Sequence, residues 1–184
     1  MQNRTATRQD GVTLIELIIT LAILAVGAGL ATSGVSAAIH AANTSSATSS
    51  LYAALTQARS SAANSTADVV LCPSADGASC SAGYHWENGW IAFVVTHTGS
   101  DRTPDEPILL HQQALPAKVH LITSAGRTRI RFQPSGSNAG SNATFTLCDG
   151  RGPAKASAYA MANNGNLHST TPDPVYVADA CANL

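Results

Sequence analysis

The chain has 184 residues, of which 45% are hydrophobic and 11% are charged, whereas a typical soluble domain has about 25% charged residues. Its formal net charge is −1 at pH 7, so there is no general basic field for nucleic acid, and any such binding needs a local patch. The length allows one ordinary domain with an appendage. The lack of charge is concentrated near the start, because Glu16 is the only ionisable side chain from Val12 to Ile39.

The first forty residues allow two simple interpretations, and neither accounts for Glu16. A cleaved secretory signal would use Arg4 and Arg8 as its basic region, but the apolar run is longer than the usual length of about 7–15 residues. A plain membrane anchor needs about 20 apolar residues, which residues 12–31 supply. It has no use for Glu16, because a carboxylate inside a bilayer costs about 2.5–3.5 kcal/mol.

A third interpretation accounts for the glutamate. The stretch "GVTLIEL", residues 11–17, resembles the class III signal of type IV pilins and type II secretion pseudopilins. The resemblance implies that a prepilin peptidase removes residues 1–11 by cutting between Gly11 and Val12, and that it methylates the new amine. It also implies that Glu16 pairs with the N-terminal amine of a neighbouring subunit, so that opposite charges offset each other's desolvation. The family usually has Phe where this chain has Val12.

Helical patterning continues beyond the apolar run. Residues 41–65 are rich in Ala and Ser, and their larger apolar side chains recur on one helical face at Leu51, Tyr52, Leu55 and Ala58. We therefore predict one helix over residues 12–64, roughly 80 Å long. Its first part, about residues 12–34, is the expected transmembrane segment.

After residue 64 the pattern changes to short apolar runs separated by turn residues such as "DG", "NG" and "NNG". This spacing predicts antiparallel strands. The runs are "DVVLC", "WIAFVVT", "ILLHQ", "VHLITS", "RIRFQ", "TFTLC", "AYAMA" and "VYVA". Because the apolar face of the helix needs a partner, a sheet that packs against it is the simplest arrangement. The predicted fold class is α+β, with a long N-terminal helix and a β domain over residues 65–184.

Four cysteines follow the apolar run, and an even number behind a membrane or export signal predicts disulfides. Of the three possible pairings we favour Cys72–Cys80 with Cys148–Cys181, because the first pair encloses the turn-rich "CPSADGASC". Zinc would need closely spaced Cys or His ligands, and the sequence has no C-x-x-C, so we expect no metal site. The histidines lack H-E-x-x-H spacing and there is no G-x-S-x-G. We therefore expect neither a catalytic site nor a cofactor.

The resemblance becomes narrower in the second half. The pieces "LYAALTQARSSAANSTADVVLC", "WENGWIAFV", "RIRFQPSG" and "FTLCDGRG" are similar, in this order, to the FimT/FimU and GspH group of minor pilins and pseudopilins. This implies a single-pass protein of the bacterial inner membrane with its β domain in the periplasm, later extracted into a filament near the tip. The implied partners are major and minor pilins or pseudopilins, the prepilin peptidase and the inner-membrane assembly platform.

Three roles follow from this resemblance: priming or capping of a type IV pilus, which we favour, type II protein secretion, and DNA uptake. DNA-binding members carry G-R-x-R where this chain has Gly165, Asn166 and His168. An earlier "GRTRIR", residues 126–131, would place alternating arginines on one face of a strand. The candidate DNA-binding residues are Arg127, Arg129, Arg131, Arg151 and Lys155.

The competing interpretation of these cations is a solvated surface. Acidic residues would then balance them, namely Asp101, Asp105, Glu106 and Asp149. Of the two tryptophans, Trp90 begins an apolar strand and is expected in the core. Trp86 lies in a predicted loop, where its ring is the more available of the two for stacking on a base.

Overall fold

The computed structural model describes residues 11–138, 140–182 and 184, without the side chains of residues 28–33. Arg4, Arg8 and the rest of the expected leader up to residue 10 lie outside the described residues. Contacts divide the chain into two compact units, residues 1–38 and 39–184. The division falls inside the long helix, whose second part packs on the strands.

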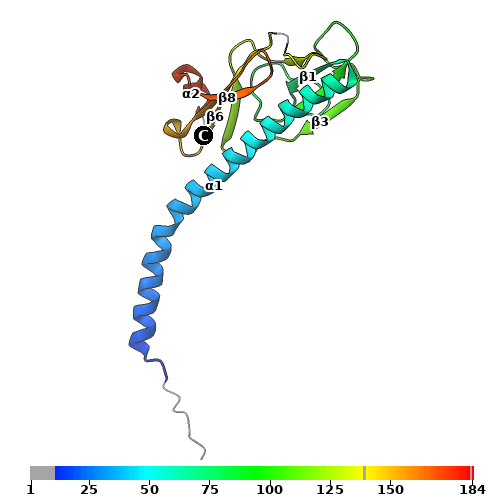
Figure 1. Ribbon diagram of the computed structural model, residues 1–184. Helices are drawn as coiled ribbons and strands as arrows, with labels where there is room; N and C mark the ends of the chain where they lie inside the picture. The colour runs from blue at the N-terminus through cyan, green and yellow to red at the C-terminus, as the bar shows by residue number, and fades with distance from the viewer. Residues whose placement is uncertain (1–10, 139, 183) are drawn as a thin grey trace, which may run out of the picture. The chain divides into compact units, whose positions relative to one another are not determined.

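Helix α1 spans Leu14–Ser65, close to the predicted 12–64 (Figure 1). In the first unit the large apolar side chains of α1 are exposed, and so is Val12 just before the helix. Those of the helix include Leu14, Ile15, Leu17, Ile18, Ile19, Leu21, Ile23, Leu24 and Val26. In the part of the chain that the structure describes, which omits the side chains of 28–33, no helix has a stretch long and apolar enough to cross a membrane. The expected span over about 12–34 is therefore not confirmed.

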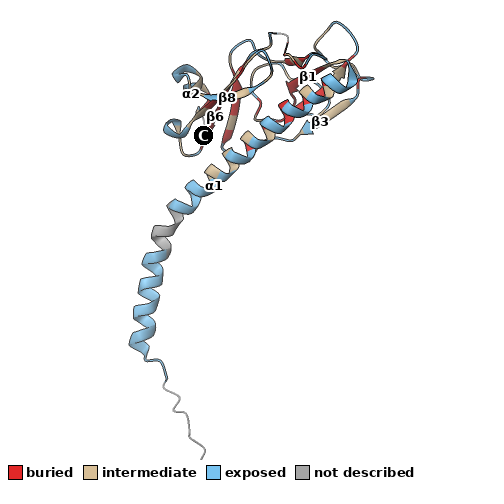
Figure 2. Ribbon diagram, in the orientation of Figure 1, coloured by how far each residue is buried: buried red, intermediate tan, exposed pale blue. Residues whose placement is uncertain are grey.

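In the second unit the same helix is amphipathic (Figure 2). Its buried positions recur every three or four residues, as a helix packed along one face requires. They are Ala47, Leu51, Ala54, Leu55, Ala58 and Ala62. Because most of these side chains are single methyl groups, the helix backbone can approach the strands closely.

The strands form two four-stranded antiparallel sheets. The first has the order β3-β2-β1-β5, with β1 at Asp68–Pro73, β2 at Trp90–Val95, β3 at Ile108–Gln112 and β5 at Ile130–Phe132. The second has the order β4-β6-β7-β8, with β4 at Val119–Thr123, β6 at Thr144–Asp149, β7 at Ser157–Met161 and β8 at Leu167–Thr170. The predicted α+β class, a long helix on antiparallel sheets, is confirmed.

Two local predictions were wrong. The run "VYVA" is not a strand but part of the short helix α2, Pro174–Ala180. Asp173 caps this helix by accepting a hydrogen bond from the backbone N–H of Val175, and Pro174 occupies its first turn, so two helix-start signals outweigh β-branched composition. Conversely, the polar "LHST" forms strand β8, because it pairs with β7 across the Gly165 turn. A short 3-10 helix, Pro153–Lys155, connects β6 to β7.

The main core lies between α1 and the two sheets. Trp90 is fully buried, as expected, but Trp86 is fully buried as well. The indole N–H of Trp86 donates to the hydroxyl of Thr123 over 3.2 Å, and its ring packs edge-on against Phe145. The prediction that Trp86 is open for base stacking was wrong, because this loop residue fills the space between helix and sheets.

Both disulfides have the favoured pairing, Cys72–Cys80 and Cys148–Cys181. The first closes the turn that follows β1. The second ties the end of β6 to the residue that follows α2, which explains how a helix of only seven residues stays on the sheet.

Candidate functional site

The N-terminal segment places Gly11 and Val12 just outside the helix. Both residues are exposed and non-helical, so the peptide bond between them is accessible. Thr13 caps the helix. Its carbonyl accepts hydrogen bonds from the backbone N–H groups of Glu16 and Leu17 at 3.1 and 3.2 Å. Its hydroxyl oxygen accepts a weaker hydrogen bond from the same backbone N–H of Glu16 at 3.4 Å. A bond expected to be cut by a peptidase therefore lies where the chain is extended and open.

Glu16 lies in the first turn of α1. The spacing Thr13-x-x-Glu16 is that of a capping box, and a carboxylate in the first turn is favoured by the helix dipole. This capping signal stands in the sequence as "TLIE", residues 13–16, but was not predicted. A glutamate here supports the start of the helix even before any contact with another subunit.

The surface around Glu16 is apolar on every side. Consecutive residues from Leu14 to Val26 are exposed, so no face of this part of the helix is covered by the described residues of its unit. A helix that is apolar all round requires an apolar environment or other helices. Each large side chain that becomes covered contributes roughly 1.5–3 kcal/mol.

The candidate DNA-binding arginines are largely paired with carboxylates. Arg131, on β5, donates from Nε to Asp68 Oδ2 over 2.6 Å and from Nη1 to the carbonyl of Gly99 over 3.0 Å. Arg129 donates to Asp101, with Nε 2.9 Å from Oδ1. Both side chains contact the loop between β2 and β3. The acidic partner of Arg129 lies in this loop, and that of Arg131 lies in the neighbouring strand β1.

Arg151 has a different neighbourhood. It forms a close pair with the buried Asp149, whose Oδ2 also accepts from the hydroxyl of Thr44 on α1 at 2.5 Å. The bonds from Arg151, opposed by burial but aided by Thr44, hold the pKa of Asp149 well below its usual range. The same pair raises the pKa of Arg151. This cluster ties the helix to the second sheet.

The five cations therefore do not form one patch. Arg151 lies beside Thr44, whereas Arg131 holds Asp68, just after the helix ends at Ser65. The helix between these points is about 30 Å long at 1.5 Å per residue. Arg127 lies in the exposed β4–β5 connection, and Lys155 lies in the 3-10 helix. The predicted gathering of these side chains was wrong, because only three residues of "RTRIRF" form a strand and the rest is loop.

Two of the acids expected on a solvated surface are buried, Glu106 and Asp149. Burial alone would raise the pKa of Glu106. Hydrogen bonds from Thr103, Thr96 and His97 outweigh burial and lower the pKa from 4.5 to about 2. Glu106 therefore organises the β2–β3 loop, and nothing in the sequence marked it out from the exposed Asp105 beside it.

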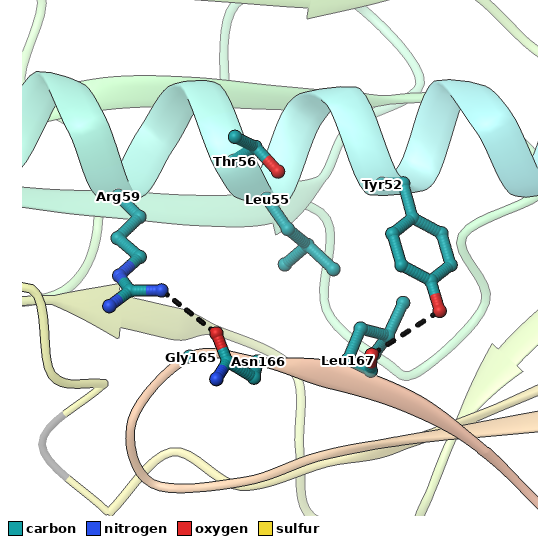
Figure 3. A pocket seen from close by; sticks show the side chains of 7 residues that line it. All are labelled: Tyr52, Leu55, Thr56, Arg59, Gly165, Asn166 and Leu167. Atoms are coloured by element: carbon teal, nitrogen blue, oxygen red, sulfur yellow. Dashed lines mark hydrogen bonds between the residues drawn. The ribbon is translucent and has the colours of Figure 1, made fainter.

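A pocket of about 400 Å³ lies between α1 and the turn that joins β7 to β8 (Figure 3). It is lined by Tyr52, Leu55, Thr56, Arg59, Gly165, Asn166 and Leu167. No sequence motif predicted a site at this position. Among the described residues, no group of His, Cys, Asp and Glu side chains could hold a metal ion.

A long N-terminal helix packed on antiparallel sheets, with an exposed apolar start that carries one glutamate, defines a pilin-like protein. Residues 47–165 match the family model described as type II transport protein GspH, and residues 6–32 match the prokaryotic N-terminal methylation motif. The first match covers more than half of the chain, so the chain belongs to the GspH family of minor pilins and pseudopilins.

Solved structures of a minor pilin show the same fold. Two crystal forms of the type IV minor pilin FimU from Pseudomonas aeruginosa match with 18% and 19% identity and TM-scores of 0.52 and 0.54. Each covers 69% of this chain, and 92% and 87% of FimU. The minor pseudopilin EpsH from the type 2 secretion system of Vibrio cholerae matches with 16% identity and a TM-score of 0.46, covering 67% of this chain and 93% of EpsH. A comparison with curated proteins finds no match.

Proposed function

We propose that this protein is a minor pilin that primes or caps the assembly of a type IV pilus. The observation that carries the proposal is the exposed apolar start of α1 with Glu16 as its only ionisable group. Such a surface has no partner among the described residues of its own unit, and a pilin-family filament supplies one in the helices of neighbouring subunits. The match to the N-terminal methylation motif supports the same role.

The proposed steps are those that the resemblance to pilins implies. Prepilin peptidase cuts between the exposed Gly11 and Val12 and methylates the new amine. The apolar segment over about residues 12–34 holds the subunit in the inner membrane, with residues 65–184 in the periplasm. The Glu16 carboxylate then pairs with the N-terminal amine of the adjacent subunit, because an unpaired charge in an apolar bundle carries a large desolvation cost. The assembly platform moves the subunit into the filament beside major and minor pilins.

The test is a count of surface pili in cells that lack the protein and in cells complemented with variants. We expect few or no pili without the protein and with Glu16→Gln, which keeps the shape but removes the charge. The matched control is Asp105→Asn, which removes an exposed carboxylate that has no hydrogen-bond partner in the described part of the chain. Normal piliation with Glu16→Gln would refute the proposal.

A second candidate is a pseudopilin of type II secretion, which the description of the matching family favours. The same deletion strain separates the two roles. In that case pilus number stays unchanged, and enzymes that are normally secreted accumulate in the periplasm.

Nucleic acid binding has less support. Arg129, Arg131 and Arg151 are each neutralised by an aspartate of the same chain, and a phosphate would have to displace that aspartate. DNA uptake would require salt-dependent binding that falls with Arg129→Ala and Arg131→Ala.

A further inference from the structure

The pocket beside the β7–β8 turn combines an arginine with apolar walls (Figure 3). Tyr52 and Arg59 extend from α1 towards the turn, two helical turns apart, and Leu55 lies between them. The tyrosine hydroxyl donates to the carbonyl of Leu167 over 3.4 Å. The opening between the two side chains leads to an apolar wall made by Leu55 and Leu167, with the guanidinium at one end.

Arg59 is held in this position by the backbone around it. Its Nη1 donates to the side-chain oxygen of Asn166 over 3.0 Å. A Cβ at Gly136 would lie 3.3 Å from Nε of Arg59, and one at Gly165 would lie 3.3 Å from Cδ. Both glycines have positive φ, +78° and +76°, so two turns that need glycine also make room for the arginine. The side chain lies in a fitted slot and is not a free surface cation.

The charge of Arg59 is not neutralised within the described residues. No carboxylate of that part of the chain lies within 4.0 Å of it, in contrast to Arg129, Arg131 and Arg151. A guanidinium has five N–H donors in a planar fork that matches a carboxylate. The bond to Asn166 uses one of them, and the pocket exposes the fork to a ligand.

We propose that this pocket receives an acidic side chain of a neighbouring pilin subunit, together with an aliphatic side chain next to it in the same segment. The carboxylate pairs with Arg59, and the aliphatic group packs on Leu167 and on the exposed ring of Tyr52, because Leu55 is already almost fully buried. This inference rests on the proposed function, because a filament is what brings a second pilin to this face. Complementary charge sets which segment docks, and the volume of about 400 Å³ limits the docked part to a few side chains.

The test is site-specific photocrosslinking in piliated cells. The photoreactive amino acid p-benzoylphenylalanine replaces Thr56, which is exposed and lines the pocket, or Ala53, which is exposed on the same helix but does not line it. Crosslinked peptides are identified by mass spectrometry. We expect the probe at 56, and not the one at 53, to join a pilin peptide within one or two residues of Asp or Glu. Arg59→Gln should lower the yield about tenfold, as the loss of a charge-assisted hydrogen bond implies.

Asn166→Asp separates partner binding from a purely structural role of Arg59. This variant keeps the shape of Asn166 and places a carboxylate of the same chain beside the guanidinium. If Arg59 binds a neighbour, the crosslink yield falls while the unfolding temperature holds or rises. If Arg59 only supports its own domain, the yield does not change, and the proposal is wrong.

Other crosslinking results also test the proposed role of the Arg59 pocket. Crosslinks at 56 that survive Arg59→Gln, that join lipid or nucleic acid, or that match those at 53 overturn the proposal. Reversal of both charges, Arg59→Glu with the partner's acidic residue changed to Arg, should restore the yield. If Glu16→Gln abolishes pili while these crosslinks do not depend on Arg59, only this inference fails. If Glu16→Gln leaves assembly normal, the proposed function fails, whatever the probe at 56 shows.

Discussion

Replacing Glu106 with Gln should destabilise the second unit far more than its single-atom change suggests. One carboxylate oxygen accepts from the backbone N–H of Thr96 at 2.6 Å, from the Thr96 hydroxyl at 3.1 Å and from His97 Nδ1 at 3.0 Å. The other accepts from the backbone N–H of Thr103 at 2.9 Å. The carboxylate is buried, so water cannot replace a lost partner.

In the Glu106→Gln variant the side-chain NH₂ group, which is itself a donor, faces the backbone N–H of Thr96 or Thr103. That N–H group then loses its acceptor. An unsatisfied buried group costs about 1–3 kcal/mol, and the remaining bonds lose their charge assistance. We therefore expect the free energy of unfolding to fall by about 2–4 kcal/mol. The measurement is urea unfolding of the full-length protein in detergent, followed by the fluorescence of Trp86 and Trp90, both of which are buried in this unit.

The same reasoning predicts a dependence on pH. Because the folded-state pKa of Glu106 is lowered from 4.5 to about 2, its stabilisation is complete above about pH 5 and is lost as the pH falls towards 2. The difference between wild type and Glu106→Gln should shrink by about 2 kcal/mol from pH 7 to pH 3. Asp105→Asn, the exposed neighbour, should change stability by less than about 0.5 kcal/mol. The reasoning would be refuted if Glu106→Gln lowered the free energy of unfolding by less than about 0.5 kcal/mol. It would also be refuted if the decrease were the same at pH 7 and pH 3.

Three further predictions concern the same unit. Removing the disulfide by Cys148→Ala with Cys181→Ala should lower the free energy of unfolding by about 4 kcal/mol, the loop entropy for a separation of 33 residues, as urea unfolding would show. Arg131→Ala should lower it by about 1–2 kcal/mol and leave retention on a DNA column unchanged, since the arginine already holds an aspartate. Gly150→Ala should cost about 1–3 kcal/mol in thermal unfolding, because a Cβ there would lie 2.6 Å from Cε1 of His40; an unaltered melting temperature would contradict this.

The elements that the sequence predicted well are those whose pattern is set locally. The second part of the long helix has a helical apolar period, and most strands are short apolar runs between turn residues, so their bounds came within a few residues. The "VYVA" run failed because β-branched composition was weighed above the Asp173–Pro174 start signal. Strand β8 was missed because a polar edge strand depends on its partner, and nothing in "LHST" shows that β7 lies beside it.

The sites were less predictable, because they depend on pairs distant in sequence. Asp68 meets Arg131 across 63 positions and Thr44 meets Asp149 across 105, and no single-sequence pattern links them. The alternative in which acidic residues balance the arginines holds for Asp101 and Asp149, but nothing in the sequence singled out Asp68 as the partner of Arg131. The slot around Arg59 needs the glycines at 136 and 165 to come together, which only the fold brings about.

The Cys148–Cys181 bond makes a covalent ring that contains β7, β8 and α2. A protease that cuts once inside this ring, for example in the turn at Asn166, produces two pieces that remain joined. The loose end cannot diffuse away, so the broken strand can return to its place at a high local concentration. A nicked molecule would thus run as one band on a non-reducing gel and as two after reduction. The turn beside the Arg59 pocket can therefore be cut without being lost from the protein.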